Sequence, residues 1–364
     1  MLTSALIPSG AFGWVRRIRV TGRVELEQYF EKGEYTLYPA GRMGCSDRLS
    51  YTLTELARSL LDSAKKTSPE KFDAALEHGG FVAVERSIRQ GDTQCFVCVH
   101  SGKNDKNPDQ PYIVVAFRGS ENDVGDWLTN ADATPASEFN FGAVHQGFYK
   151  AYMSVQDKVL AAIAKARDDY CKDTPVFFTG HSLGGALAVV ATRLNAAATA
   201  GACYTYGCPR VGNYEFFKGL KTPIYRIVNS NDLVPRVPPG AWSKLILGLL
   251  KLLAFVSAKS PWLSGLFEYM KEFVDKINDY RHHGDMRFLP DLPSAKIEDS
   301  SSHIRQLQVL SNPNQLDMVQ WFFRHAAVSF GMPVKSHSMK LYRNKLLKVA
   351  NNRMERYENG QAQI

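Results

Sequence analysis

The sequence predicts an α/β protein with a mostly parallel, doubly wound sheet and helices on both faces. Between residues 112 and 228, apolar runs with strand character alternate with helical patterns, and this alternation is typical of a parallel sheet. The run Tyr112–Phe117 is apolar without interruption, as expected of a strand buried on both faces. A third observation, a strand that turns sharply into a helix near residue 182, fits the same architecture.

Length and composition describe an ordinary globular protein. The 364 residues suffice for one large α/β domain with additions or for two small domains. Hydrophobic residues make up 45% of the chain and charged residues 22%. A net charge of +8 favours anionic surfaces without specifying one. The basic residues are spread along the chain and no nucleic-acid-binding signature accompanies them, so no nucleic-acid partner is predicted.

The six cysteines are predicted to be mostly reduced and structural. Cys95 and Cys98 form a C-x-x-C pattern inside a predicted strand, where residues three apart face opposite sides. The first eight residues have no basic region ahead of their short apolar run, so no conventional signal peptide is predicted. We therefore expect a cytoplasmic or peripherally membrane-associated protein, with non-classical secretion as the alternative.

The other elements follow from hydrophobic periodicity. Strands are predicted at residues 14–26 (a hairpin), 81–84, 96–99, 112–117, 176–178, 202–206, 223–228 and 286–289. Helices are predicted at residues 51–64, 144 to about 170, after residue 182, 318–330 and from 337 onward. The side chains that follow parallel strands meet at one edge of the sheet, so Ser120, Ser182 and Asp232 are expected on a common rim.

Ser182 is the predicted nucleophile. The apolar run Val176–Phe178 leads into a G-x-S-x-G pentapeptide, and small and apolar residues at 186–191 follow. Gly180 and Gly184 permit a turn so tight that a Cβ would clash, which exposes the hydroxyl at the end of a strand. The next helix begins there, and its N-terminal N–H groups stabilise negative charge. The alternative is a helix N-cap serine after a glycine turn.

A serine nucleophile needs a base, and the base needs an acid that fixes its tautomer. Asp232 is the predicted acid, because it follows Ser182 in the order that this type of fold requires and lies in a turn after a strand; the alternative is an Asx-turn residue before a proline. The histidines after Asp232 are His282, His283, His303, His325 and His337. Placement alone leaves His282 and His337 close, because both are predicted in loops beside regular elements.

The chain resembles the class 3 lipases, which are fungal-lipase-like α/β-hydrolases. The blocks that carry the resemblance are residues 115–120 with 126–128, 144–148, 178–185, 205–213, 231–236, 280–284 and 337–342. They occur in the family order over roughly residues 80–345, which is far more specific than any single motif. Cys208 departs from the polar or small residue that is commoner at its position, which is harmless if the side chain is buried.

The resemblance implies roles for further residues. The family's catalytic histidine lies in the last block, which implies His337 as the base and leaves His282 as the second choice. Ser120 and the backbone N–H of Leu183 are implied as oxyanion-hole donors. The segment of Asp126, Trp127 and Leu128 is implied as a lid. His145 and His181 are interpreted as hydrogen-bonding support rather than as bases.

The predicted organisation is an N-terminal extension packed on the core (1–80), an α/β-hydrolase domain (81–350) and a basic tail (351–364). Residues 241–279 form a helical insertion in the domain: a nearly all-apolar helix precedes an amphipathic one. The first is short for a membrane span and contains Lys251. The pair either packs as a cap on the domain or partitions into lipid.

The predicted function is a serine carboxylic-ester hydrolase that releases fatty acids from acylglycerols, most specifically a triacylglycerol lipase. No metal or organic cofactor is implied, and the predicted partner is a transient lipid–water interface. The alternatives among enzymes are a phospholipase A1 and an esterase of soluble esters. A non-catalytic lipase-like scaffold is the alternative from another class, and it is disfavoured because such proteins often lose triad residues.

Overall fold

A computed structural model of the chain describes residues 44–63, 69–101, 111–119, 142–170, 172–195, 201–230, 232–237, 280–290, 309–313 and 336–358. Several predictions therefore lie outside the described residues. These are the hairpin at 14–26, Ser120, the lid at 126–128, the insertion at 241–279 and the helix at 318–330.

Eight strands form one sheet in chain order. They are β1 (Phe81–Gln90), β2 (Thr93–His100), β3 (Tyr112–Phe117), β4 (Val176–His181), β5 (Cys203–Tyr206), β6 (Ile224–Asn229), β7 (Asp285–Leu289) and β8 (Leu310–Ser311). Strands β3 to β7 pair in parallel, whereas β1, β2 and β8 pair antiparallel with their neighbours. The predicted mostly parallel sheet is confirmed.

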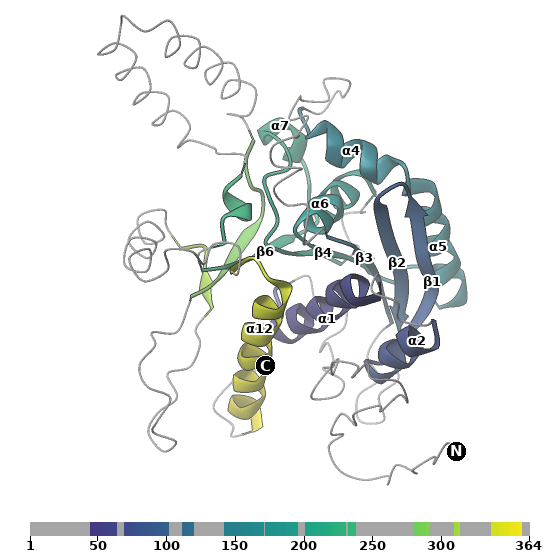
Figure 1. Ribbon diagram of the computed structural model, residues 1–364, viewed down its shortest axis with the longest axis horizontal. Coiled ribbons are helices and arrows are strands. Elements are labelled where there is room, and N and C mark those ends of the chain that lie inside the picture. Colours follow the sequence, from purple (N-terminus) through teal and green to yellow (C-terminus); the bar gives the residue numbers. More distant parts are fainter. Residues whose placement is uncertain are drawn as a thin grey trace, which may run out of the picture.

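Helices cover both faces of this sheet, as predicted, but the two faces are covered in different ways (Figure 1). One face carries the helices that connect parallel strands: α4 (Gln146–Met153), α5 (Gln156–Asp169), α6 (Leu183–Asn195) and α7 (Tyr214–Phe217). The other carries α1 (Asp47–Ser63), α2 (Pro69–His78) and α12 (Met339–Glu358). We call these the crossover face and the terminal face.

The strand order explains this division. Each parallel strand lies beside the strand before it in the chain, so the chain crosses the sheet in one direction without a reversal. Because crossover connections are right-handed, successive crossovers in one direction lie on the same side of the sheet. The second face is therefore left to helices from outside the run of parallel strands, and α1 and α12 lie side by side there (Figure 1).

The long helix predicted from residue 144 to about 170 is two helices, and the prediction of a single helix is wrong. The break lies at Ser154 and Val155, between α4 and α5. The Ser154 hydroxyl donates to the carbonyl of Ala151 at 2.7 Å, and serine side chains that bond nearby carbonyls disturb a helix. Phe148 and Val159 nevertheless reach the same core, since the chain bends around the sheet.

The last helix extends into the segment that is predicted as a basic tail. α12 runs from Met339 to Glu358, so residue 351, where the basic tail was predicted to begin, lies inside the helix. Buried positions recur at Tyr342, Leu346 and Ala350, and this spacing of four residues keeps one side of the helix against the sheet.

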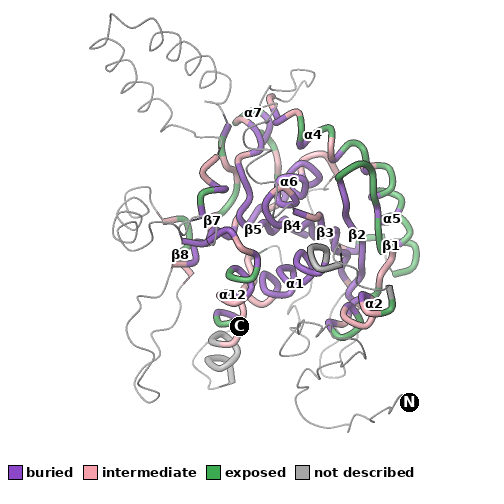
Figure 2. Tube along the Cα trace, in the orientation of Figure 1, coloured by how far each residue is buried: buried purple, intermediate pink, exposed green. Residues whose placement is uncertain are grey.

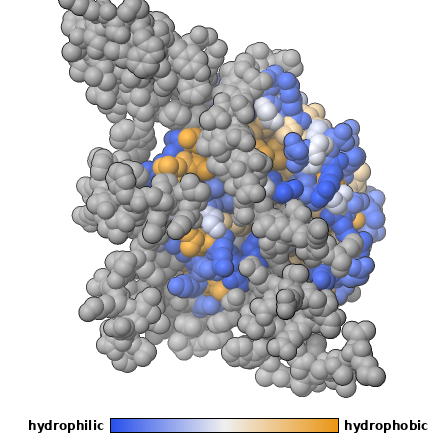
Figure 3. Space-filling model, in the orientation of Figure 1, coloured by the Kyte–Doolittle hydropathy of each residue, from blue (hydrophilic) through white to orange (hydrophobic). Residues whose placement is uncertain are grey.

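Each face of the sheet has its own hydrophobic core (Figure 2). Cys95 belongs to the core of the crossover face and Cys98 to that of the terminal face, which confirms that the two thiols point in opposite directions. Where described residues reach the surface in Figure 3, they are mainly hydrophilic. Within the described part of the chain, no helix has the length and apolar character needed to cross a bilayer.

Candidate active site

Ser182 occupies a strained turn between β4 and α6. Its φ of 55° lies in the left-handed region that non-glycine residues rarely adopt. A Cβ on Gly180 would lie 2.3 Å from the carbonyl carbon of Gly184, and one on Gly184 would lie 2.4 Å from the carbonyl oxygen of Phe117. Only glycine fits at these two positions, so the pentapeptide closes the turn as the sequence predicts.

The turn is fixed by backbone bonds and leaves the Ser182 hydroxyl uncommitted. The Ser182 N–H donates to the carbonyl of Tyr206 on β5 at 2.9 Å, and the N–H of Gly185 donates to the Ser182 carbonyl. Ser182 is fully buried, and its Oγ has no hydrogen-bond partner among the described residues. Such a buried hydroxyl at a helix N-terminus suits a nucleophile.

Asp232 lies just beyond β6 and is fully buried. Its Oδ1 accepts the N–H of Val234 at 3.0 Å, so the Asx-turn considered from the sequence is present. The same carboxylate contacts His337, whose Nδ1 lies 3.0 Å from Oδ1 and 2.9 Å from Oδ2. Tyr342 of α12 donates its hydroxyl to Oδ2 at 2.5 Å. Turn formation and acid function are thus compatible at this residue.

His337 lies immediately before α12 and is buried. A carboxylate only accepts, so Nδ1 carries the proton that faces Asp232, and Nε2 is the basic nitrogen. Nε2 has no hydrogen-bond partner within the described residues. The ring centre of His337 is 4.5 Å from that of His181, the residue before Ser182. The structure therefore brings the predicted acid and base together, and the base lies against the residue that precedes the predicted nucleophile.

Gly207, just after β5, makes room for this arrangement. A Cβ at this position would lie 2.8 Å from Asp232 Oδ2 and 2.9 Å from His337 Nδ1. Its φ of 58° also favours glycine. A side chain here would push the acid and the base apart, which explains why the chain has glycine where β5 meets the rim.

His282, the second choice for the base, is engaged elsewhere. Its Nε2 donates to the carbonyl of Pro235 at 2.5 Å. Burial lowers the pKa of His282 well below its usual value, and the positive charges of Arg226 and Arg210 lower it further. Among the described contacts, His282 touches the loop after Asp232 and not its carboxylate.

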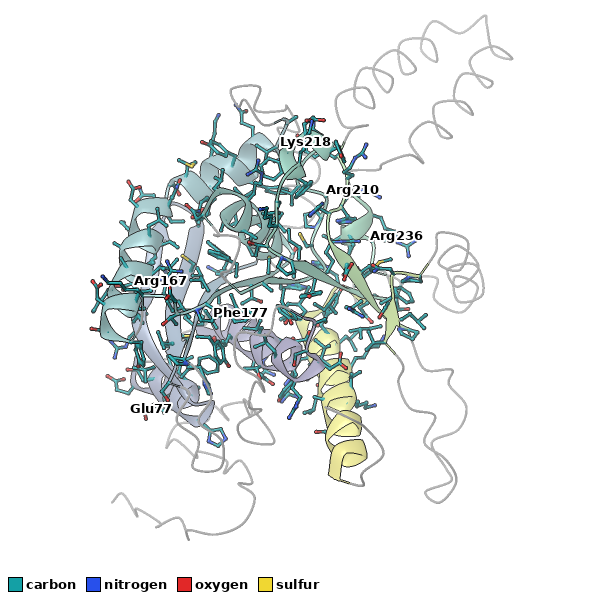
Figure 4. The ribbon with its side chains drawn as sticks, turned by 180° about the vertical axis from the view of Figure 1, so that it is seen from behind. Glu77, Arg167, Phe177, Arg210, Lys218 and Arg236 are labelled. Carbon is teal, nitrogen blue, oxygen red and sulfur yellow. The ribbon has the colours of Figure 1, made fainter. Side chains whose placement is uncertain are left out.

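The loop that follows Asp232 is held by donors on three consecutive carbonyls. His282 donates to Pro235, the Nη1 of Arg210 donates to Arg236, and the N–H of Arg210 donates to Val237 at 2.8 Å. Figure 4 shows Arg210 and Arg236 near each other beside the strands at this end of the sheet. The segment that follows the predicted acid is therefore tied to neighbouring parts of the chain at these three carbonyls.

His181 makes a hydrogen bond of the kind expected from the sequence, whereas His145 is described by its ring contacts. His181 Nε2 donates to the backbone carbonyl of His337 at 2.7 Å. Burial, followed by the nearby His337, keeps the pKa of His181 well below its usual value, so the ring is neutral near pH 7. His145 stacks on Phe148 with ring centres 4.1 Å apart.

The predicted oxyanion-hole donors are described only in part. Leu183 is the first residue of α6, directly after the nucleophile. Ser120 lies outside the described residues, but the residue before it, Gly119, lies against the turn that carries Ser182. A Cβ on Gly119 would lie 2.3 Å from the His181 carbonyl oxygen. This close approach explains the glycine before Ser120.

Three contacts around the site were missed by reasoning from the sequence. Tyr342 lies in the last block of the family resemblance, but the sequence indicates no role for it, for Asn229 or for Glu55. Asn229 ends β6 and contacts the segment before His337, and Glu55 of α1 pairs with Arg343 of α12 at 2.6 Å. A polar residue at a strand end and a carboxylate on the buried side of a helix were the available signals.

Cys208 is buried at 4% exposure, so its departure from the family pattern is accommodated. Burial raises the pKa of its thiol, which keeps it protonated. Cys45, Cys95, Cys98 and Cys203 are likewise free thiols.

Comparison with known proteins gives a consistent result. A family model described as lipase (class 3) matches residues 114–242. Secreted mono- and diacylglycerol lipase 1 of Fusarium solani is 40% identical over 145 residues, which are 35% of this chain and 39% of that protein. A lipase of Rhizomucor miehei is 34% identical over 149 residues, 37% of this chain and 40% of that protein.

A plant protein is similar over a longer stretch. Phospholipase A1-II 1 of Oryza sativa subsp. indica is 30% identical over 205 residues, 48% of this chain and 51% of that protein. The matches span less than two thirds of the length of each of these relatives. The solved native complex of Rhizomucor miehei lipase with its propeptide covers 67% of this chain and 68% of that chain, at 22% identity and a TM-score of 0.46.

Proposed function

We propose that this chain, in which residues 114–242 match the class 3 lipase family model, is a member of that family and hydrolyses carboxylic esters of lipids through Ser182, His337 and Asp232. The specific proposal is a triacylglycerol lipase. The observation that supports the proposed triad most directly is the buried bond between Asp232 and His337 Nδ1 at 2.9 Å. This bond leaves the other ring nitrogen, Nε2, unpaired among the described residues.

The proposed reaction begins with His337 Nε2 taking the proton of the Ser182 hydroxyl as the oxygen attacks the ester carbonyl. The imidazolium that forms is stabilised by the Asp232 carboxylate, which Val234 and Tyr342 hold in place. The imidazolium then gives its proton to the leaving alcohol. A water molecule, deprotonated by the same nitrogen, attacks the acyl-enzyme and releases the fatty acid.

The negative oxygen of the tetrahedral intermediate needs donors placed before the reaction starts. The Leu183 N–H at the start of α6 and a donor from Ser120 are the proposed pair. Each such donor contributes about 3 kcal/mol to lowering the barrier. The lid at Asp126, Trp127 and Leu128 remains part of the proposal, as does the cap formed by residues 241–279.

The first experiment compares wild type with Ser182→Ala for labelling by a fluorophosphonate and for hydrolysis of p-nitrophenyl esters and triglyceride emulsions. We expect labelling and hydrolysis that both require Ser182. Labelling that persists in the variant would place the nucleophile elsewhere, and a wild type that neither labels nor hydrolyses would favour the non-catalytic scaffold. A second pair, His337→Ala and His282→Ala, tests the base; an inactive His282→Ala with an active His337→Ala would reverse the assignment.

A second candidate is a phospholipase A1, which one similar protein is named as. Phosphatidylcholine labelled differently in its two acyl chains distinguishes the candidates. Release of the sn-1 chain faster than any chain of a triglyceride would favour the phospholipase. Activity confined to monomeric short-chain esters, without an increase when substrate aggregates, would favour an esterase of soluble esters.

We also propose that the chain works as a peripheral protein at a lipid–water interface. The net charge of +8 and the apolar segment within residues 241–279 support this proposal. Flotation with anionic and with zwitterionic vesicles, repeated after deletion of residues 241–279, tests it. Equal recovery with both vesicle types and both proteins would rule out a charge-assisted contact through the insertion.

A further inference from the structure

We propose that Asn229 and His181 are positioning residues that hold the loop of the base in register with both other members of the triad. They donate to two consecutive backbone carbonyls, those of Ser336 and His337. This inference rests on the proposed function, because it assigns a purpose to the placement of His337.

Asn229 makes three hydrogen bonds that connect β6 to the loop of His337 and to α12. It is the last residue of β6, three residues before Asp232, and only 1% exposed. Its Nδ2 donates to the Ser336 carbonyl at 2.7 Å, and its Oδ1 accepts from Lys345 Nζ at 2.5 Å. Its backbone N–H donates to the Tyr342 hydroxyl at 2.9 Å. One buried amide thus ties the acid's strand to the base's loop and to α12.

His181 supplies the second half from the strand of the nucleophile. It is the last residue of β4 and directly precedes Ser182. Its Nε2 lies 2.7 Å from the His337 carbonyl. Because a carbonyl oxygen only accepts, Nε2 must carry the proton, and the ring acts here as a neutral donor.

Together the two bonds fix both peptide groups on which the His337 side chain depends. A single bond would leave its peptide plane free to rock about that contact, whereas two adjacent carbonyls held from different strands fix the position and the tilt of the loop. The reference points are β6, which carries the acid, and β4, which carries the nucleophile. A displacement of about 1 Å in such a site can cost about 100-fold in rate.

The test uses substitutions that remove one donor each and keep the volume. Asn229→Asp keeps the oxygen that faces Lys345 but loses the N–H that faces Ser336. His181→Leu removes the donor to His337, whereas His181→Gln places an amide N–H near the original Nε2. Asn195→Asp is the matched control, because Asn195 Nδ2 donates to the Ala191 carbonyl at 3.1 Å at the far end of α6.

Turnover is measured per active site, after titration of Ser182 with a fluorophosphonate, on a soluble p-nitrophenyl ester. We expect kcat to fall about 100-fold in Asn229→Asp and in His181→Leu with KM little changed, and His181→Gln to recover much of the loss. The double variant should lose less than the product of the two single losses, because both donors hold the same loop. Asn195→Asp should retain wild-type kcat.

Hydrogen exchange of the peptide that contains residues 336–338 gives a readout that needs no activity. We expect faster exchange there in Asn229→Asp and His181→Leu than in wild type or Asn195→Asp. The inference is overturned if kcat in these variants matches that of the control, or if His181→Gln is as impaired as His181→Leu. If wild type hydrolyses no ester, the proposed function fails, and unchanged exchange in this peptide would then overturn the positioning role as well.

Discussion

The crossover face and the terminal face of the sheet are built from different kinds of contact. The core of the crossover face is mostly aliphatic, and Tyr152 is the only buried tyrosine among its described members. The core of the terminal face has six buried tyrosines in the described chain: Tyr51, Tyr112, Tyr204, Tyr206, Tyr225 and Tyr342. A buried tyrosine needs a partner for its hydroxyl, so this second core is also a network of hydrogen bonds.

The contacts of the terminal face join distant parts of the chain. Glu55 and Arg343, whose side chains bond across α1 and α12, are 288 residues apart. The Tyr206 hydroxyl donates to the carbonyl of Ser50, 156 residues away. On the crossover face, by contrast, α6 packs against β4 and β5, the strands immediately before and after it in the chain.

This difference divides the candidate triad. Ser182 is positioned by its own neighbours in the chain, through the glycine turn and α6. Asp232 and His337 are joined across 105 residues, and Asp232 also bonds Tyr342 of α12, a helix of the terminal face. We therefore expect damage to the crossover face to reduce stability alone, and damage to the terminal face to reduce activity as well.

The largest expected effect comes from changing the bond between Asp232 and His337. Asp232→Asn should lower kcat about 10,000-fold, equivalent to about 5 kcal/mol, because an amide favours the wrong tautomer of His337. Steady-state hydrolysis of a soluble ester measures this. Asp285→Asn is the control, since Asp285 is exposed at the start of β7. A loss below tenfold in Asp232→Asn would remove Asp232 from the triad.

The next largest effect is expected from breaking the ion pair between Glu55 of α1 and Arg343 of α12. Arg343→Met should reduce the free energy of unfolding by about 3–5 kcal/mol, because the buried Glu55 carboxylate loses the guanidinium that bonds it at 2.6 Å. Ile163→Ala, on α5 of the crossover face, should cost about 2–5 kcal/mol by leaving a cavity. Urea unfolding measures both.

Activity separates these two variants. Turnover per titrated site should fall in Arg343→Met, since α12 carries Tyr342, which bonds Asp232, and begins directly after the loop of His337. It should stay at the wild-type value in Ile163→Ala. Equal turnover in both variants would remove the functional distinction between the two faces.

Acid should weaken the terminal face through His100. This residue is 3% exposed, stacks on Tyr112, and has a pKa lowered by burial from 6.5 to about 4. Between those pH values the unfolded chain binds a proton that the folded chain does not, so stability decreases as pH falls from 6.5 to 4. The loss approaches about 3 kcal/mol at the lower limit.

His100→Phe removes this proton uptake while keeping a ring against Tyr112. Urea unfolding of wild type and variant at pH 7 and pH 4.5 tests the expectation, which is a smaller decrease for the variant. An identical decrease in both proteins would assign the acid sensitivity to other groups, such as the buried His181 and His282, whose pKa values are also lowered.

The smallest of these effects concerns one hydroxyl. Tyr342→Phe removes the donor to Asp232 Oδ2, and a bond to a charged group contributes about 2 kcal/mol. We expect lower stability and a lower kcat. Tyr204→Phe, which loses a bond to the Ser46 N–H, should cost about 1 kcal/mol and leave kcat unchanged. Wild-type kcat in Tyr342→Phe would show that Val234 and His337 hold the carboxylate without help.

Much of the fold could be predicted because most of its strands contain a short apolar run. Strand β8 and helices α2 and α7 were missed, and in β8 and α7 two and four residues are too few to show a period. The break between α4 and α5 was also missed, because the apolar spacing continues across Ser154 while the hydroxyl disrupts the backbone only locally.

The site could be predicted unevenly. The sequence indicated Ser182 by the glycines of its turn, and Asp232 by chain order. It did not distinguish His282 from His337 as the base, and the resemblance to a family favoured His337. Nothing in the local sequence indicated that His282 would donate to Pro235 while His337 faces Asp232.

The sequence by itself determined the elements that short-range physics controls: buried strands, the glycine turn, and the serine at its apex. Only the tertiary structure decided which distant groups meet there, namely Tyr342 on Asp232 and the donors on the carbonyls of Ser336 and His337. The reason is that a turn is encoded by the sterics of neighbouring residues, whereas a hydrogen bond between segments 100 residues apart or more depends on how the faces of the sheet pack.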